Sequence, residues 1–198
     1  KGGWKIIKPN KLTAKLQPDP KIKDAISKIN QHYMNQHLET IVKKYSRRSV
    51  APGNQEIVTY IENHLKDHSF QTTKDCFSPG LCNIYGIIPG EIDEYVLIEA
   101  HLDSVGHAQA GADDNASGTA SLLELARLLS EKSHKRGLII FATNGEESGL
   151  LGSKTFVQKA KTSGLLSKIK FVINMDMIAY NKNSIVDIET DKRFEDLA

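Results

Sequence analysis

The chain has 198 residues, of which 39% are hydrophobic and 25% charged, an ordinary composition for a globular domain with one substantial core. The Lys and Arg behind the net charge of +2 are scattered, which excludes the basic signature of a nucleic-acid-binding protein. No apolar run approaches the roughly 20 residues that a membrane-spanning helix needs. We therefore expect neither nucleic acid nor a membrane as a partner. The first residues also lack the apolar segment of a signal peptide, so an exported protein would be present here in a mature or trimmed form.

Residues 1–45 are predicted to form an N-terminal region of an arm and helices, and residues 46–198 the main domain. Residues 1–20 contain Gly, Pro and Lys without a sustained period, which indicates an extended arm. Between residues 19 and 44, apolar residues recur every three or four positions, which predicts one or two amphipathic helices. His32 and His37 lie here without an acidic partner at metal-ligand spacing, so we interpret them as solvated.

The next segment predicts a packing helix followed by a hairpin. Asn54 is expected to cap the helix. Residues 69–77 and 82–90 are rich in β-branched and aromatic side chains, which is typical of two strands at a sheet edge. Cys76 and Cys82 flank a Pro-Gly turn, and both a short disulfide, which would favour an oxidising compartment, and two separate thiols fit this spacing.

Strand-like runs then alternate with helical patterns. Alternation of this kind predicts an α/β fold, a three-layer sandwich in which a mixed, largely parallel sheet is flanked by helices. The predicted elements are a strand at 94–100, a helix at 116–129, a strand at 138–143, a helix at 149–161, a strand at 171–175 and a short strand at 185–188.

Three of these strands end in metal-ligand residues. His101 and Asp103 follow the first, Glu146 and Glu147 the second, and the third leads into Asp176. Strand ends at one edge of an open α/β sheet are where such folds bind ligands, and imidazole and carboxylate are ligands of Zn²⁺. The order of these residues predicts a metal centre assembled from several loops, with His101 as the first ligand.

The remaining acids can divide the work of a hydrolytic site. Asp103, two residues after His101, would face the same way and orient the imidazole. In the segment GADDNASG, small residues allow a sharp turn, so that one of Asp113 and Asp114 reaches the metal. Of the adjacent Glu146 and Glu147, one would bind metal and the other would accept a proton from water. Taken singly, each motif is also typical of a solvated turn or a helix cap.

Four motifs in order carry a resemblance to a known family. HLDSVG, GADDNASGTASLLELARLL, LIIFATNGEESGLLGS and VINMDMIAY, within residues 46–180, are similar to the motifs of the dizinc aminopeptidases, which include the Aeromonas-type leucyl aminopeptidase and the glutamate carboxypeptidase group. The resemblance implies a zinc-exopeptidase fold, two Zn²⁺ ions and peptide substrates.

Carried over by position, the resemblance also implies individual roles. His101 would bind one zinc, Asp176 the same or the neighbouring zinc and Glu147 the other, with Asp114 bridging both. Glu146 would be the general base, Asp103 would orient His101, and the peptide bond after Asp114 would be cis.

The chain departs from the family in one respect. The family has a further histidine ligand some tens of residues after the motif around Asp176, and no such histidine precedes Ala198. His107 and His134 lie outside the matching context. We therefore expect the chain to be a fragment that lacks part of its sheet, its substrate pocket and its last ligand, so that a C-terminal segment of the same protein completes the site.

The predicted function is that of a secreted or periplasmic metallo-aminopeptidase, in which Glu146 activates a metal-held water for attack on an N-terminal peptide bond. Two other classes of protein stay open. One is a glutaminyl-cyclase-like acyltransferase, whose type resembles a single-zinc site, and the other is a non-catalytic binding relative. His107 and Gln109 lie between the first two motifs, and a plain surface loop is the preferred interpretation there.

Overall fold

The computed structural model describes residues 5–7, 19–49, 53–105, 111–180 and 188–190, and its contacts divide the chain into two compact units. In the smaller unit, Lys1–Lys28 with Tyr180–Ala198, strand β1 (Lys5–Ile7) pairs antiparallel with β7 (Ile188–Thr190). Helix α1 (Pro20–Ser27) belongs to this unit and has no buried residue. Of the short strand predicted at 185–188, only Ile188 lies in the described part, where it is the first residue of β7.

The larger unit, Ile29–Ala179, contains the metal-ligand motifs. Helix α2, which precedes the domain limit predicted after residue 45, belongs to this unit by its contacts. The elements of this unit are α2 (Gln31–Lys44), α3 (Gly53–Asp67), β2 (Gln71–Ser78), β3 (Leu81–Ile88), β4 (Ile92–His101), η1 (Ala112–Ser117), α4 (Gly118–Ser130), β5 (Arg136–Thr143), α5 (Leu151–Thr162), α6 (Leu165–Lys168) and β6 (Ile169–Asn174).

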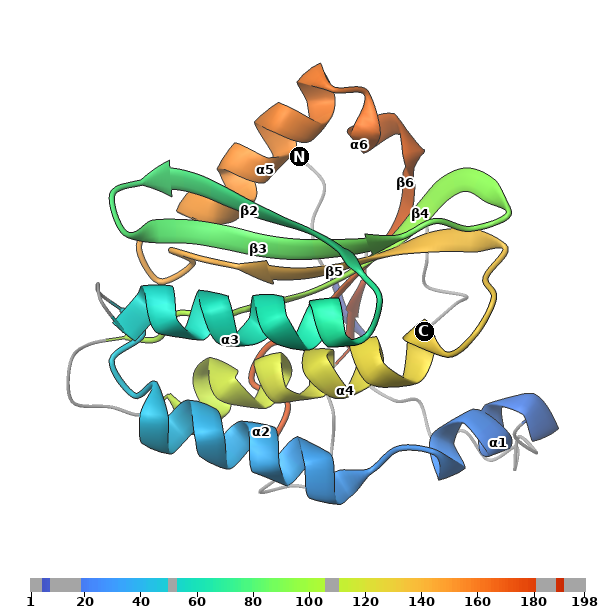
Figure 1. The fold of residues 1–198 in the computed structure, drawn as a ribbon, viewed down its shortest axis with the longest axis horizontal. Coiled ribbons are helices and arrows are strands. Elements are labelled where there is room, and N and C mark those ends of the chain that lie inside the picture. The colour runs from blue at the N-terminus through green and yellow to red at the C-terminus, as the bar shows by residue number, and fades with distance from the viewer. Residues whose placement is uncertain (1–4, 8–18, 50–52, 106–110, 181–187, 191–198) are drawn as a thin grey trace. The chain divides into compact units, whose positions relative to one another are not determined.

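Five strands form a mixed sheet in the order β2-β3-β5-β4-β6 (Figure 1). β2 and β3 form the predicted edge hairpin, and β3 is antiparallel to β5. β4 runs parallel to both of its neighbours, β5 and β6. The carboxyl ends of β4, β5 and β6 therefore meet at one edge of the sheet, as the strand-end argument requires.

Side chains alternate between the two faces of β5. Ile140 and Ala142 belong to one core cluster, whereas Ile139 and Phe141 belong to the other. This alternation is the two-residue period of a strand whose two faces are both covered, and it explains the continuous apolar run of the sequence.

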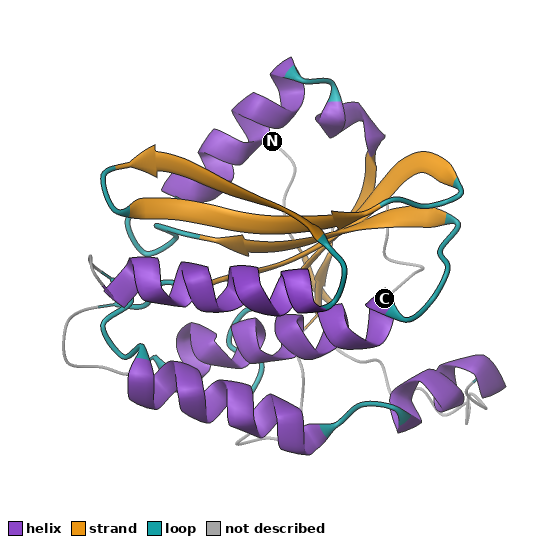
Figure 2. Cartoon of the chain, viewed as in Figure 1, coloured by secondary structure: helices purple, strands orange, loops and turns teal. Residues whose placement is uncertain are grey.

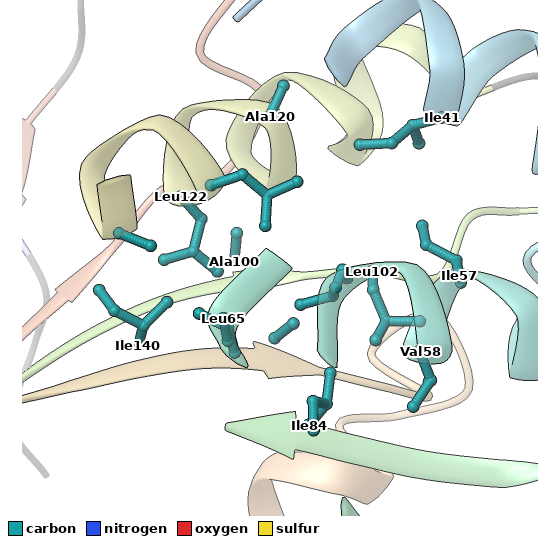
Figure 3. Packing of buried hydrophobic residues seen from close by; sticks show 14 of the residues in the cluster. Ile41, Ile57, Val58, Leu65, Ile84, Ala100, Leu102, Ala120, Leu122 and Ile140 are labelled. Carbon is teal, nitrogen blue, oxygen red and sulfur yellow. The ribbon is translucent and has the colours of Figure 1, made fainter. Parts of the chain in front are cut away.

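Helices cover both faces of this sheet, which makes the predicted three-layer sandwich (Figure 2). On one face, α2, α3 and α4 bury a cluster that includes Ile41, Ile57 and Leu122, and burial of each such side chain stabilises the fold by about 1.5–3 kcal/mol (Figure 3). On the other face, Phe156 and Ala160 of α5 pack on the sheet.

Two local predictions were wrong. Asn54 does not cap α3 from outside but lies within it, fully buried, where its amide bonds to the carbonyl of Arg48 at 2.7 Å and to Asn144 at 2.8 Å. His37 is half-buried rather than solvated, with Nδ1 2.6 Å from the hydroxyl of Tyr60. Neither partner is visible in local sequence, because Tyr60 and Asn144 come from other elements.

The two cysteines are joined in a disulfide. Cys76 of β2 lies opposite Cys82 of β3 in the hairpin register, so the turn between them brings the thiols together. Of the two interpretations left open by the spacing, the structure has the disulfide. Within the described residues, no helix has the length and apolarity to cross a membrane.

Candidate metal centre

Three strand ends bring the predicted ligands to one place. His101 is the last residue of β4 and pairs in register with Thr143, the last residue of β5, from which the chain continues to Glu146 and Glu147. β6 ends at Asn174, two residues before Asp176. His101 can share one ion with Asp114 and Asp176, and ligand atoms of His101, Glu146 and Glu147 also lie within 4.8 Å of one another.

His101 is the buried centre of the cluster, with 3% of its side chain exposed. Its Nε2 atom lies 3.1 Å from Oδ1 of Asp114 and 3.4 Å from Oδ1 of Asp176. Both carboxylates are more open, with 38% and 41% of their side chains exposed. The imidazole thus projects from the protein interior toward acids that line an accessible side.

The charge around His101 favours a cation. Burial lowers the pKa of His101, but the facing carboxylates of Asp103, Asp176 and Glu146 outweigh burial and raise this pKa to about 9. These acids stabilise the positive charge of the protonated imidazole. A bound metal ion would supply positive charge at the same place and neutralise the acids in the same way.

Asp103 is buried and lies close to two parts of the cluster. Its Oδ1 atom is 3.6 Å from Nδ1 of His101, which is longer than a hydrogen bond, so it acts on the imidazole through its charge. Its two oxygens accept hydrogen bonds of 3.2 Å from the backbone N–H groups of Glu146 and Glu147. Asp103 therefore fixes the glutamate loop relative to the end of β4.

The turn η1 separates the roles of the two adjacent aspartates. Its backbone is non-helical at Asp114 and Asn115, and the peptide bond between them is cis, as the family resemblance implied. Asp114 faces His101, whereas Asp113 accepts a 3.0 Å hydrogen bond from the backbone N–H of Ala179. Asp113 thus ties the turn to the segment after Asp176.

Glu146 and Glu147 are half-buried beside the same acids. For both glutamates, burial raises the pKa above the usual range, neighbouring carboxylates raise it further, and His101 lowers it. A raised pKa makes a carboxylate a better proton acceptor near neutral pH, which suits a general base.

The donor set fits a metal ion. His101 Nδ1 and Nε2 and Glu147 Oε1 are buried atoms without a hydrogen-bond partner in the described part of the chain. Buried polar atoms are normally satisfied, so atoms of this kind fit the role of metal ligands. Neutral imidazole with several carboxylates is a suitable set for Zn²⁺.

Sequence reasoning missed three residues that support these loops. Arg48 is fully buried and bonds to the carbonyl groups of Leu102 and Gly111. Asn115 donates to the carbonyl of Met175 at 2.9 Å, and Asn144 pairs with Asn54. Arg48 lies outside the four motifs, and Asn115 and Asn144 lie within them without being metal-ligand types, so their burial and contacts identify them. His107 and Gln109 lie outside the described residues.

The sequence is similar to those of curated leucine aminopeptidases. A probable leucine aminopeptidase from Arthroderma otae is 30% identical over 184 residues, which cover 82% of this chain and 48% of the relative. The chain spans about half the length, or less, of the curated relatives it matches.

Two solved structures share the fold. The LapA aminopeptidase of Legionella pneumophila superposes with a TM-score of 0.76 at 19% identity, over 90% of this chain and 50% of that one. A glutaminyl cyclase of Porphyromonas gingivalis gives 0.66 at 20% identity, over 76% and 60% of the two chains. The sequence profile described as Peptidase family M28 matches residues 83–197, more than half of the chain. The chain therefore belongs to peptidase family M28.

Proposed function

We propose that this chain is the metal-binding part of a zinc-dependent exopeptidase, and specifically of an aminopeptidase. The observation that carries the proposal is the buried imidazole of His101 at the ends of parallel strands, facing Asp114, Asp176 and the Glu146–Glu147 pair. Membership of family M28 and the leucine aminopeptidase names of its relatives support the substrate class.

The proposed ligands divide between two ions. His101 and Asp176 would hold one ion, Glu147 would hold the other, and Asp114 would bridge them. When bound, zinc polarises the scissile carbonyl group and lowers the pKa of water. The protein's own contribution is to fix these donors: the buried end of β4 holds the imidazole, and Asp103 holds the glutamate loop through the N–H groups of Glu146 and Glu147.

Glu146 is proposed as the general base. It is adjacent to the proposed ligand Glu147, and its backbone is held by Asp103. Its carboxylate would accept a proton from the attacking water and deliver it to the leaving amine. A base that accepts and then donates needs a pKa near neutrality, which is the direction in which burial moves the pKa of Glu146.

A segment of the same protein outside this chain is proposed to complete the site with a further histidine. β6 lies at the sheet edge, and Val172 and Ile173, which point to opposite faces, are 54% and 41% exposed. Apolar side chains exposed on both faces of a strand support coverage by further structure. The roughly half-length match to the relatives gives room for such a segment.

A secreted or periplasmic location is proposed on one observation of this chain. The disulfide between Cys76 and Cys82 favours an oxidising compartment, because cytosolic thiols are kept reduced. Loss of leucine aminopeptidase activity from the culture medium or periplasmic fraction after deletion of the gene would support this location.

Hydrolysis of leucine p-nitroanilide by the full-length protein, with and without a zinc chelator, tests the proposal. We expect turnover that the chelator abolishes and that N-acetylation of the substrate prevents, because a free α-amine is recognised. Cyclisation of an N-terminal glutaminyl peptide without hydrolysis would instead favour the acyltransferase, with which the fold is shared. Metal binding without either reaction would favour a binding protein.

A further inference from the structure

Arg48 lies outside every metal-ligand motif and yet contacts two of the segments that carry them. Its side chain is fully buried, with Nε donating to the carbonyl of Leu102 at 2.8 Å and Nη2 donating to the carbonyl of Gly111 at 2.9 Å. Leu102 stands between His101 and Asp103, and Gly111 precedes the Asp113–Asp114 turn. A guanidinium presents its donors in a rigid plane, so these two bonds fix the separation of the two carbonyl groups.

A pair of buried amides connects Arg48 to the third ligand segment. Asn54 donates to the backbone carbonyl of Arg48 at 2.7 Å. It also forms a reciprocal pair with Asn144, in which the two hydrogen bonds measure 2.8 and 2.6 Å. Asn144 lies two residues before Glu146, and its backbone N–H donates to the buried side chain of Asn83. One connected network therefore reaches three of the four segments that carry proposed ligands, all except the one with Asp176.

Stability alone does not account for a charge at this position. Burial lowers the pKa of Arg48 to about 10, against the opposing effect of Asp103 and Asp114. Apolar side chains of similar volume often stabilise a buried position at least as well as a buried charge does. Arg48 is costly to bury and bonds to two functional loops. Its contribution is therefore to fix the positions of these loops rather than to stabilise the core.

We propose that Arg48, with its backbone held by the Asn54–Asn144 pair, is a positioning residue that sets the spacing of three of the four segments carrying the metal ligands, those of His101, Asp114 and Glu147. The inference rests on the proposed metal site. Without the Arg48 side chain, the end of β4 and the η1 turn would be joined more loosely. His101 and Asp114 would then be less well placed to share an ion.

The test is the zinc affinity of Arg48→Met and Arg48→Lys in the full-length protein, measured by competition with a chromophoric chelator. Both changes should weaken zinc binding by about 10- to 100-fold, the usual effect of losing a group that supports metal ligands. Lys keeps the charge but not the planar fork, so it should restore little of the affinity. Leu65→Ala is the matched control, because it destabilises α3 in the core at a residue outside the ligand segments and outside the Arg48 network.

The outcomes separate this inference from the proposed function. Wild-type affinity in Arg48→Lys would show that charge alone suffices and would overturn the positioning role, as would an equal loss in Leu65→Ala. If Arg48→Met does not fold, Asn54→Ala should still lower zinc affinity by about tenfold, and unchanged affinity there would overturn the inference. Absence of zinc from the wild-type protein would overturn the proposed function as well.

Discussion

His101 acquires its properties from its position at the buried end of β4. The strand removes the imidazole from water, and the loops after β5 and β6 place acids in front of it. The same arrangement half-buries Glu146, which we assign to proton transfer rather than to metal binding. This division between adjacent glutamates can be tested by changing one atom.

Replacement of Glu146 by Gln should preserve zinc content and lower kcat by about 10²- to 10⁴-fold, because the amide cannot accept the proton. The measurement is peptide hydrolysis with elemental analysis of the same sample. Glu131→Gln, at an exposed acid of α4's C-terminal end, is the control. Full turnover in Glu146→Gln would remove it as the base.

At the scale of elements, the junction of η1 and α4 holds Asp114 and Asp176 together. A Cβ atom at Gly118 would lie 2.3 Å from the carbonyl oxygen of Met175 and 2.4 Å from Oδ1 of Asn115. The amide of Asn115 also bonds to Met175. Only glycine therefore allows the helix to begin this close to the segment before Asp176.

Gly118→Ala should destabilise the protein by about 1–3 kcal/mol, as expected for overpacking, and should also weaken zinc binding. Denaturant unfolding and a zinc titration measure the two effects. Gly164→Ala is the control, because its positive φ of 80° makes Ala costly although a Cβ there would meet nothing within 4 Å. Retained zinc affinity in Gly118→Ala would contradict the close-approach argument.

The junction of α2, α3 and α4 contains a cluster of three histidines, His37, His64 and His68, which is separate from the candidate metal centre. His37 bonds to Tyr60, and its ring meets that of His64 edge-on at 4.8 Å. Burial and then His64 lower the pKa of His37 to about 4, His68 adds to this effect, and Glu124 opposes it. The folded protein therefore keeps His37 neutral where the unfolded chain would already be protonated.

The sign of the resulting pH dependence is fixed. His37 titrates near 6.5 when unfolded and near 4 when folded, so its stabilising contribution is complete above pH 6.5 and is lost as the pH falls toward 4. His37→Gln should reduce the loss of stability over this range by about 1–3 kcal/mol, allowing for partial exposure. Urea unfolding across pH measures it, with His32→Gln on the same helix as the control. Parallel curves for wild type and His37→Gln would contradict the assignment.

The sheet and its helices follow from hydrophobic period, which is a local property. β5 and α4 were predictable because their apolar runs and spacings appear within the segment itself. Local sequence misassigned Asn54 and His37 because their partners, Asn144 and Tyr60, lie in other elements. The same reason hides Arg48.

At the scale of the whole molecule, the strand order turns separate motifs into one cluster. β4 lies between β5 and β6 although β5 and β6 follow it in sequence, so the ligand segments at the ends of these three strands converge on one edge. The strand-end pattern predicted a metal centre, because parallel strands place their ends together, whereas the assignment of individual ligands was implied by the family resemblance and stays a prediction. The spacing among those ligands depends on Asp103 and Arg48 contacts that no motif encodes.

The number of zinc ions per chain tests the proposed centre most directly. Elemental analysis of the full-length protein should give two zinc ions per chain, and Asp114→Ala, which removes the proposed bridge, should give fewer than one. Wild-type protein without zinc, or unchanged zinc content in Asp114→Ala, would contradict the account of the site.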